Sequence, residues 1–263
     1  DHFGIYLCRD VALGHARLSI LDLKPGQQPI SNEDQTLWIV YNGEVFNYIE
    51  LRRDLEARGH RFATASDTEV IVHLYEQYGA DCLHRLNGQF AFAIWDEKDR
   101  SLFLARDRLG VRPLFYTQIQ GTLVFGSEIK AILAHPQARA ELDPVALDQV
   151  FTYWSTLSPR TCFRGIVELP PGHYMVAQAG RLRVTPYWEI AFPEWGDQAD
   201  RDGARGIGGV VEERRALLVD ATRLRLQADV PVGAYLSGGL DSSTIAAIIR
   251  ALGGSRLDTF SIA

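Results

Sequence analysis

A chain of 263 residues is long enough for one large domain, or for one domain and part of a second. Its content of 46% hydrophobic and 23% charged residues supports a buried core and argues against a disordered or fibrous protein. The net charge of −6, without any basic run, argues against binding to nucleic acid or to a membrane surface.

The sequence also bears on the compartment and on the extent of the protein. No apolar stretch approaches the roughly 18 residues that span a membrane, and the first residues do not have the pattern of a signal peptide. The three cysteines, Cys8, Cys82 and Cys162, form neither a metal-binding pair nor a disulfide framework, which favours the cytoplasm. Because Met175 is the only methionine, we expect this chain to be part of a longer protein.

The first elements predicted along the chain are two strands and two helices. Strands are predicted at 11–21 and 36–41, and Asn42-Gly43 is expected to end the second because this pair readily takes positive φ. A helix is predicted at 48–58 from its leucine spacing. A capping box, Ser66 to Glu69, predicts a second helix that runs to Tyr78.

Hairpins dominate the next part of the chain. They are predicted at 90–106, 114–126 and 174–184, each with turn residues between two apolar runs. A helix is predicted from the Asp143-Pro144 start to Trp154, because Pro suits the first helical position. Hairpins that follow helices indicate stacked antiparallel sheets and not a βαβ series.

The composition of the sequence changes at residues 193–209, a charged and glycine-rich segment that we interpret as a linker. Beyond it the pattern predicts a helix at 211–227, a strand at 232–236, a helix at 243–252 and a strand at 257–262. This order is typical of the opening of a parallel α/β domain. We therefore expect three parts: a first domain at 1–192, the linker at 193–209 and an incomplete second domain at 210–263.

The segment Ser237-Gly238-Gly239-Leu240-Asp241-Ser242-Ser243 connects the predicted strand at 232–236 to the next helix. Glycines let the backbone approach a ligand closely, and the N–H groups of a helix start attract an anion. The serines add donors, and Asp241 offers a carboxylate for Mg²⁺ beside phosphates. A strand–helix connection without a ligand is the plain alternative, but seven residues in this context favour a function.

This segment resembles the pyrophosphate-binding loop of the ATP pyrophosphatases, which adenylate a carboxylate or carbonyl oxygen and release pyrophosphate. In the asparagine synthetase branch of these proteins, the resemblance implies that Leu236 and Ile262 flank the adenine. It also implies ATP and Mg²⁺ as cofactors. The implied ATP-binding residues are Leu236, Ser237, Gly238, Gly239, Asp241, Ser242, Ser243 and Ile262.

A second set of residues, Arg17, Asn42-Gly43-Glu44 and Asp67, suits the chemistry of a glutamine amide. An arginine binds a carboxylate in a fork, and an aspartate pairs with an ammonium group. Hydrolysis of the amide passes through an oxyanion, which an Asn side chain and a glycine N–H stabilise. Taken singly, each residue has an ordinary explanation as a surface charge, a turn or part of a helix cap.

Three segments in this order resemble class II glutamine amidotransferases: Gly14 to Leu21 (GHARLSIL), Asn42-Gly43-Glu44, and Ser66 to Glu69 (SDTE). Their arrangement upstream of the pyrophosphatase-like loop makes a chance match hard to accept. The glutamine-binding residues that the resemblance implies are Arg17, Leu18, Ser19, Ile20, Leu21, Asn42, Gly43, Glu44 and Asp67.

The resemblance also implies a role for each position. Arg17 binds the glutamine carboxylate, and the four residues after it line the site through the backbone. Asn42 and Gly43 form the catalytic oxyanion hole. Glu44 and Asp67 bind the α-amino end.

Together the two motif sets resemble the glutamine-hydrolysing asparagine synthetases. The implied fold is an N-terminal-nucleophile αββα sandwich, followed by the start of a parallel α/β domain of the adenine nucleotide alpha hydrolase type. The implied reaction uses ammonia from glutamine and ATP to convert aspartate into asparagine through β-aspartyl-AMP. The implied partners are the small molecules glutamine, aspartate and ATP; a homodimer is compatible with the family, and neither nucleic acid nor membrane is expected.

The sequence departs from the family at its nucleophile, an N-terminal cysteine whose α-amino group acts as base. We expect Cys8, Cys82 and Cys162 to be inert, and we expect the rest of the synthetase domain to lie beyond this chain. This chain alone is therefore expected to catalyse neither reaction; ammonia release from glutamine by it would contradict this expectation. Two alternatives stay open: a relative of the β-lactam synthetases with another acceptor, and a non-catalytic module. Retention of Arg17, Asn42-Gly43-Glu44 and Asp67 argues against the first, and the lack of substitutions at the ligand-binding positions present argues against the second.

Overall fold

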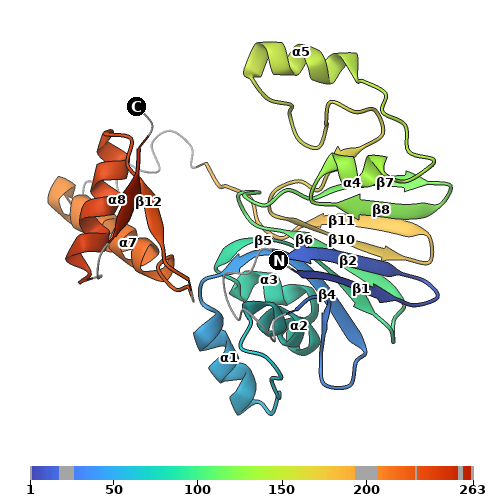
Figure 1. Ribbon diagram of the computed structural model, residues 1–263, viewed down its shortest axis with the longest axis horizontal. Coiled ribbons are helices and arrows are strands. Elements are labelled where there is room, and N and C mark those ends of the chain that lie inside the picture. The colour runs from blue at the N-terminus through green and yellow to red at the C-terminus, as the bar shows by residue number, and fades with distance from the viewer. Residues whose placement is uncertain (1, 18–26, 193–205, 229, 254–256, 262–263) are drawn as a thin grey trace. The chain divides into compact units, whose positions relative to one another are not determined.

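The computed structural model describes residues 2–17, 27–192, 206–228, 230–253 and 257–261. The chain forms two compact units, Asp1–Glu189 and Ile190–Ala263. Figure 1 shows the helices and strands of each unit. Among the described helices, none has both the length and the apolar character that crossing a membrane requires.

The centre of the first unit is an antiparallel sheet of six strands in the order β11-β10-β6-β5-β4-β3. Its strands are β3 (Ile30–Ser31), β4 (Leu37–Val45), β5 (Gly88–Asp96), β6 (Ser101–Arg106), β10 (His173–Gln178) and β11 (Arg181–Pro186). Short turns join β5 to β6 and β10 to β11, as the sequence predicts. Strand β4 pairs along its whole length with β5, so that Asn42 lies opposite Ala91 and Gly43 opposite Phe90.

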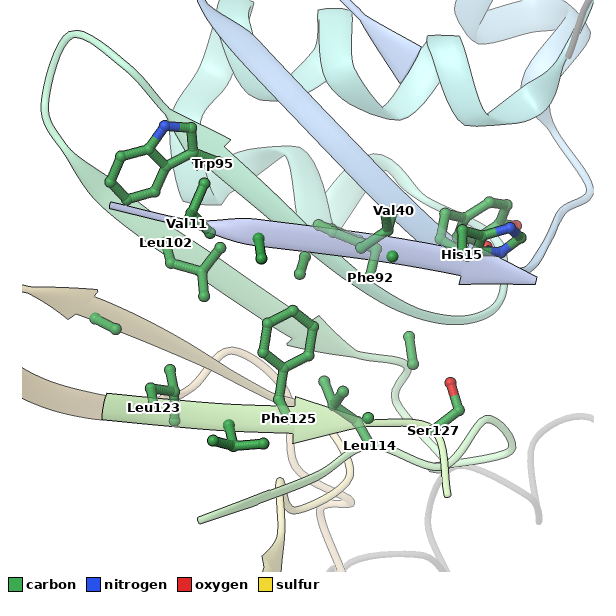
Figure 2. Close-up of a pocket in the computed structure, with 18 of the residues that line it drawn as sticks. Val11, His15, Val40, Phe92, Trp95, Leu102, Leu114, Leu123, Phe125 and Ser127 are labelled. Carbon is green, nitrogen blue, oxygen red and sulfur yellow. The ribbon is translucent and has the colours of Figure 1, made fainter. Parts of the chain in front are cut away.

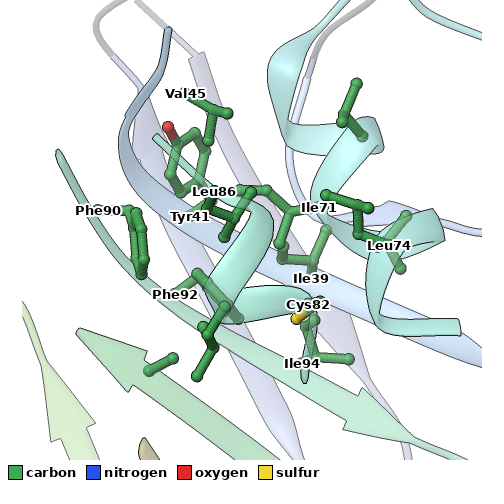
Figure 3. Packing of buried hydrophobic residues seen from close by; sticks show 14 of the residues in the cluster. Ile39, Tyr41, Val45, Ile71, Leu74, Cys82, Leu86, Phe90, Phe92 and Ile94 are labelled. Atoms are coloured by element: carbon green, nitrogen blue, oxygen red, sulfur yellow. The ribbon is translucent and has the colours of Figure 1, made fainter. Parts of the chain in front are cut away.

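One face of this sheet is covered by helices (Figure 1). They are α1 (Tyr48–Ala57), α2 (Asp67–Tyr78), the short 3₁₀ helix η1 (Gly79–Asp81) and α3 (Cys82–Arg85). Ile71 and Leu74 of α2 pack with Ile39, Phe92 and Ile94 of the sheet (Figure 3). Complete burial of these apolar side chains fixes α2 against the sheet.

The opposite face of the sheet is covered by two further, smaller sheets. One pairs β1 (His2–Leu7) with β2 (Ala12–Arg17), and the other has the order β8-β7-β9, with β7 (Phe115–Ile119), β8 (Thr122–Gly126) and β9 (Val167–Glu168). The helix α4 (Ile129–Leu133) packs against β7 and β8. The predicted sandwich of helices and two sheet layers is thus confirmed, and α4 supplies its outer helix. Figure 1 shows α5 (Pro144–Tyr153) projecting from this stack.

Two local predictions in the first unit are wrong, and one strand was not predicted. Asn42-Gly43 does not end a strand, because β4 continues to Val45. The hairpin partner β1 was not predicted, and the strand expected at 11–21 is described only as far as Arg17. The capping box is incomplete: Ser66 accepts from the Thr68 N–H, but the Glu69 carboxylate accepts from the Ala63 and Thr64 N–H groups.

The second unit contains α7 (Gly206–Leu224), β12 (Gly233–Tyr235), α8 (Leu240–Ala251) and β13 (Asp258–Phe260). Strands β12 and β13 are parallel, with α8 as their connection, which confirms the predicted opening of an α/β domain. Helix α8 begins at Leu240 and not at Ser243, so Asp241, Ser242 and Ser243 lie in its first turn. Of the predicted linker, 193–205 lies outside the described residues and the remainder belongs to α7.

Candidate functional site

A large groove of about 1450 Å³ lies in the first unit, between β2 and β8 and over the six-stranded sheet. Figure 2 shows its apolar floor and walls, including Val40, Trp95 and Leu102 from the sheet and Leu123 and Phe125 from β8. The facing strands β2 and β8 belong to different sheets and are each paired on one side by another strand. The layer that the two smaller sheets form over the six-stranded sheet is therefore divided along this groove, between the edges of β2 and β8.

One end of the groove is polar because of the alternation along β4. Side chains of a strand point to opposite faces in turn, so Asn42 and Glu44 share the groove side with Val40. The Asn42 amide donates to Ser127 Oγ at 3.3 Å, a long hydrogen bond that leaves this donor available to a ligand. His15 on β2 donates from Nε2 to the Tyr41 carbonyl oxygen at 2.8 Å.

Gly43 is required by the close approach of β5. A Cβ at this position would lie 2.1 Å from the Gln89 carbonyl oxygen and 2.7 Å from the Phe90 Cα, with φ at +156°. No side chain fits there. Gly43 therefore lets β4 and β5 pair closely immediately beside the Asn42 amide.

Asp67 connects α2 to β4. Its Oδ2 accepts from the Tyr41 hydroxyl and from the Val45 N–H, both at 2.9 Å. Burial, together with Asp67, raises the pKa of Tyr41 well above its ordinary value, so the phenol keeps its proton and donates. Asp67 is buried yet lines the groove, and it joins Asn42 and Glu44 at the polar end.

Among the unpredicted residues of the groove, Gln28 and Arg112 have buried polar atoms. Gln28 is buried, accepts from the Tyr41 N–H at 2.6 Å and donates to Thr68 Oγ1 at 3.2 Å. Arg112 lines the groove, and its Nε is buried without a hydrogen-bond partner among the described residues. Neither belongs to a recognisable motif, because a single Gln in a loop or a single Arg after a strand carries no local signal.

Several predicted site residues lie outside the described residues. Arg17 ends β2 and pairs with His2, but its side chain is not described. Leu18, Ser19, Ile20 and Leu21, which were expected to line the glutamine site, and Ile262, expected beside adenine, also lie outside.

Arg106 and Asp107, at the end of β6, have separate partners. Arg106 donates to the carbonyl oxygens of Arg112, Leu169 and Gly110 and pairs with Glu168 at 3.0 Å. Asp107 accepts instead from the N–H groups of the loop that follows it. Both residues therefore fix the backbone around the end of β6, each through its own partners.

None of the three cysteines lies among the described residues that line the groove. Cys82 is fully buried in the helical layer, and burial raises the pKa of its thiol to about 12. A thiol that keeps its proton is a poor nucleophile. Cys8 lies in the turn after β1, where its N–H donates to the Val11 carbonyl oxygen.

In the second unit, the predicted phosphate loop lies between β12 and α8. Gly238 has φ of +79°, which lets the chain turn, and Gly239 begins α8 without a side-chain cap. The Ser237 and Ser242 hydroxyls lie 3.0 Å apart, while Asp241 is exposed in the first helical turn. Leu236 donates from its N–H to Phe260 at the end of β13. The first-turn N–H groups of α8 thus suit an anion.

Comparisons with known proteins agree with this arrangement. Residues 1–188 match the family described as glutamine amidotransferase domain, and residues 213–263 match the asparagine synthase family. The chain is 43% identical over 251 residues to the glutamine-hydrolysing asparagine synthetase 3 of Bacillus subtilis, covering 94% of this chain and 40% of that protein. It is 38% identical over 244 residues to the amidase chyE of Penicillium rubens, covering 92% and 35%.

Among solved structures, the glutamine phosphoribosylpyrophosphate amidotransferase of B. subtilis is 23% identical, with a TM-score of 0.49 over 95% of this chain and 51% of that chain. The chain spans less than half the length of these two curated relatives. Because the first family match extends over residues 1–188, the chain belongs to the glutamine amidotransferase domain family.

Proposed function

We propose that the chain is the front part of a glutamine-dependent asparagine synthetase. Glutamine is hydrolysed in the first domain, 1–192, and the ammonia passes to the second, which begins at 210 after the linker 193–209. There ATP activates aspartate as β-aspartyl-AMP, and ammonia converts it to asparagine. The observation that carries the proposal is the meeting of Asn42, Glu44 and Asp67 at the polar end of one groove.

The polar end of the groove supplies what amide hydrolysis needs. The Asn42 amide and the Gly43 N–H stabilise the oxyanion of the tetrahedral intermediate. Glu44 and Asp67 bind the α-amino group, and Arg17 binds the carboxylate. Asp67 is already positioned by Tyr41 and Val45, so the site is preorganised on rigid elements.

The strand edges on either side of the groove are the basis for placing the nucleophile. The edges of β2 and β8 face each other across an apolar floor, and strand edges present unpaired N–H and C=O groups. A further strand between them would join the two smaller sheets into one layer. We place the family's cysteine nucleophile on such a strand, supplied from outside residues 1–263, because Cys82 is buried and unreactive.

The second unit fits a nucleotide polyphosphate. The uncapped first turn of α8 and the serines of the loop offer donors to phosphate oxygens, with Leu236 at the adenine. Asp241 is exposed in that turn and would hold Mg²⁺ through its carboxylate. When bound, ATP supplies the leaving pyrophosphate that drives formation of the acyl adenylate.

The test uses the full-length protein that contains this chain and the variant Asn42→Ala. We expect a fall in the kcat of glutamine hydrolysis of about 10²–10³-fold, as for loss of one oxyanion donor, with ammonia-dependent synthesis retained. Asn87→Ala, at an exposed position, is the matched control. Unchanged glutamine hydrolysis in Asn42→Ala would refute the assignment of the first unit.

A second measurement identifies the acceptor. The full-length protein is supplied with ATP, ammonia and a panel of carboxylic acids, and products are followed by mass spectrometry. Formation of asparagine, AMP and pyrophosphate from aspartate is expected, and Asp241→Asn should lower it. Turnover of another acid in place of aspartate would favour a relative of the β-lactam synthetases, and failure to bind glutamine and ATP would favour a non-catalytic module.

A further inference from the structure

A cluster of metal-ligating side chains lies in the first unit, apart from the residues that line the groove. Glu33 comes from the turn between β3 and β4, His60 from the connection between α1 and α2, and His73 and Glu76 from α2. One ligand atom from each of the four lies within 4.8 Å of all the others. Three segments distant in sequence therefore direct two imidazoles and two carboxylates to one point.

His73 is the buried member of this cluster. Its side chain is 0% exposed, and among the described residues neither ring nitrogen has a partner within ordinary hydrogen-bond geometry. Nδ1 lies 3.4 Å from Glu33 Oε2 and 3.5 Å from Glu76 Oε2, and Nε2 lies 3.6 Å from Glu69 Oε1. These separations exceed those of ordinary N–H···O hydrogen bonds. Leaving two buried ring nitrogens unsatisfied is costly, so this arrangement calls for another partner.

The groups around the cluster orient its ligand atoms. His60 Nε2 lies 3.2 Å from Gln77 Oε1, so it donates there and leaves Nδ1 as an acceptor, 3.5 Å from Glu76 Oε2. The second oxygen of Glu76 accepts from Asn32 at 3.2 Å. Such outer hydrogen bonds are what orient the ligands of metal sites.

The same holds for Glu33, whose Oε1 accepts from the Arg61 N–H at 2.7 Å while Oε2 faces His73. In both Glu33 and Glu76, one carboxylate oxygen thus accepts a hydrogen bond from outside the cluster, and the other lies near His73 Nδ1. Acceptor atoms that converge in this way repel one another unless a cation lies between them.

The spacing and chemistry select the cation. Bonds of about 2.0–2.2 Å in a tetrahedral Zn²⁺ site place ligand atoms about 3.3–3.6 Å apart, and the closest ligand pairs here lie 3.4 to 3.5 Å apart. Two imidazoles with two carboxylates suit Zn²⁺ and related transition metals better than Mg²⁺ or Ca²⁺, which prefer oxygen alone. Glu33 and Glu76 are exposed at one side and give access to solvent.

We propose that Glu33, His60, His73 and Glu76 bind one Zn²⁺-class ion, which ties the β3–β4 turn and the α1–α2 connection to α2. The first residue of α2 is Asp67, which bonds to β4 beside Asn42-Gly43. The ion therefore stabilises the helix that supports the polar end of the groove. Its role is structural, and it takes no part in glutamine chemistry.

The competing occupant is a proton on His73. Burial by itself lowers the pKa of His73, but Glu69 and Glu33, with Glu76, outweigh it and raise the pKa. His60 is the other titratable group that faces these carboxylates. Glu69 is committed elsewhere, since it accepts from the Ala63 and Thr64 N–H groups at 2.7 Å. A proton on His73 lets that ring donate to the carboxylates, but the unprotonated Nδ1 of His60 still faces the Glu76 carboxylate. A metal ion bonds to a ligand atom of all four residues.

The experiment measures Zn²⁺ binding to the purified protein after removal of metals with a chelator. Isothermal titration calorimetry and native mass spectrometry at neutral pH should show one Zn²⁺ ion bound per chain. When Co²⁺ is bound in place of Zn²⁺, the protein should show the visible absorption spectrum of tetrahedral Co²⁺. His60→Gln, at a part-buried position, should weaken binding at least about tenfold. His84→Gln, at an exposed histidine outside the cluster, should bind as the parent protein does.

Bound Zn²⁺ should also raise the melting temperature of the parent protein and not that of His60→Gln. Absence of stoichiometric binding, or equal affinities of His60→Gln and His84→Gln, would overturn the proposal and assign the cluster to a protonated His73. Gln77→Ala keeps all four ligands but removes the hydrogen bond that orients the His60 ring, so it should weaken binding less than His60→Gln does. Because the readouts are binding and stability, the result is independent of glutamine hydrolysis.

Discussion

At the scale of single residues, the geometry of the polar end of the groove depends on a few buried contacts. Gly43 allows β5 to approach, Asp67 bonds to both Tyr41 and Val45, and Gln28 holds the Tyr41 N–H. Each of these contacts is buried, so water cannot replace a lost partner. The consequence is that Asn42 projects from a rigid strand, which is what its proposed role as an oxyanion donor requires.

Gly43→Ala tests this rigidity. The added Cβ meets backbone atoms of Gln89 and Phe90, which cannot rotate away, so we expect a loss of about 1–3 kcal/mol in the free energy of unfolding, or more. Urea denaturation of the parent and the variant measures it. Gly14→Ala in β2 is the control, since its Cβ meets no atom of the described residues within 4 Å. Equal midpoints for the two variants would contradict the close approach of β4 and β5.

At the scale of elements, helix starts are set by local polar chemistry. Ser66 accepts from the Thr68 N–H at the start of α2, and Asp143 accepts from the Val145 N–H at the start of α5. Asp143 also forms an ion pair with Arg160. Both helix starts were predicted from sequence, because the signals of a helix start involve only residues a few positions apart.

The pH dependence of α5 follows from Asp143. Its pKa is lowered, first by the hydrogen bond from Arg160 and then by the N–H groups of the first turn, against the effect of burial. A lowered folded-state pKa means that the contribution is present above about pH 3.9, the unfolded value, and is lost as pH falls through the folded value.

The measurement compares urea midpoints of the parent and Asp143→Asn from pH 7 to pH 2. Asn keeps the cap but loses the ion pair, so the parent should be more stable at neutral pH and the difference should vanish in acid. Arg160→Gln should show the same trend. A difference that is constant over the whole range would contradict it.

At the scale of the whole molecule, the two units differ in how much they bury. The first unit contains two hydrophobic clusters, one on each face of the six-stranded sheet. In the described part of the second unit, Leu224 and Ile249 are the buried hydrophobic residues, while Tyr235, Leu240 and Phe260 are exposed. The free energy of folding scales with the apolar area removed from water, so the second unit has little to stabilise it.

We therefore expect residues 190–263, produced alone, to lack a cooperative unfolding transition. Thermal and urea denaturation followed by circular dichroism measure this, with residues 1–189 as the comparison, for which a sigmoidal transition is expected. A sharp transition in 190–263, with an m-value of about 1 kcal/mol/M or more, would show that the described burial underestimates its core.

The sequence by itself determined the features whose causes are local. The Asn42-Gly43-Glu44 motif, the loop from Ser237 to Ser243 and the start at Asp143 are contiguous, and the sheet-and-helix sandwich with its parallel α/β extension follows from them and from the hairpins. The placement of β4 was misjudged at Gly43, because a glycine that permits a turn also permits close pairing of strands, and only the partner strand decides which occurs.

Only the tertiary structure decided which distant residues meet. The groove needs β2 and β8 to face each other across the sheet, the bridge from Asp67 needs α2 beside β4, and the cluster around His73 joins three segments. His60 and Glu33 carry no motif and have no regular spacing relative to α2. Contacts of this kind arise from the packing of whole elements, and no pattern of neighbouring residues encodes them.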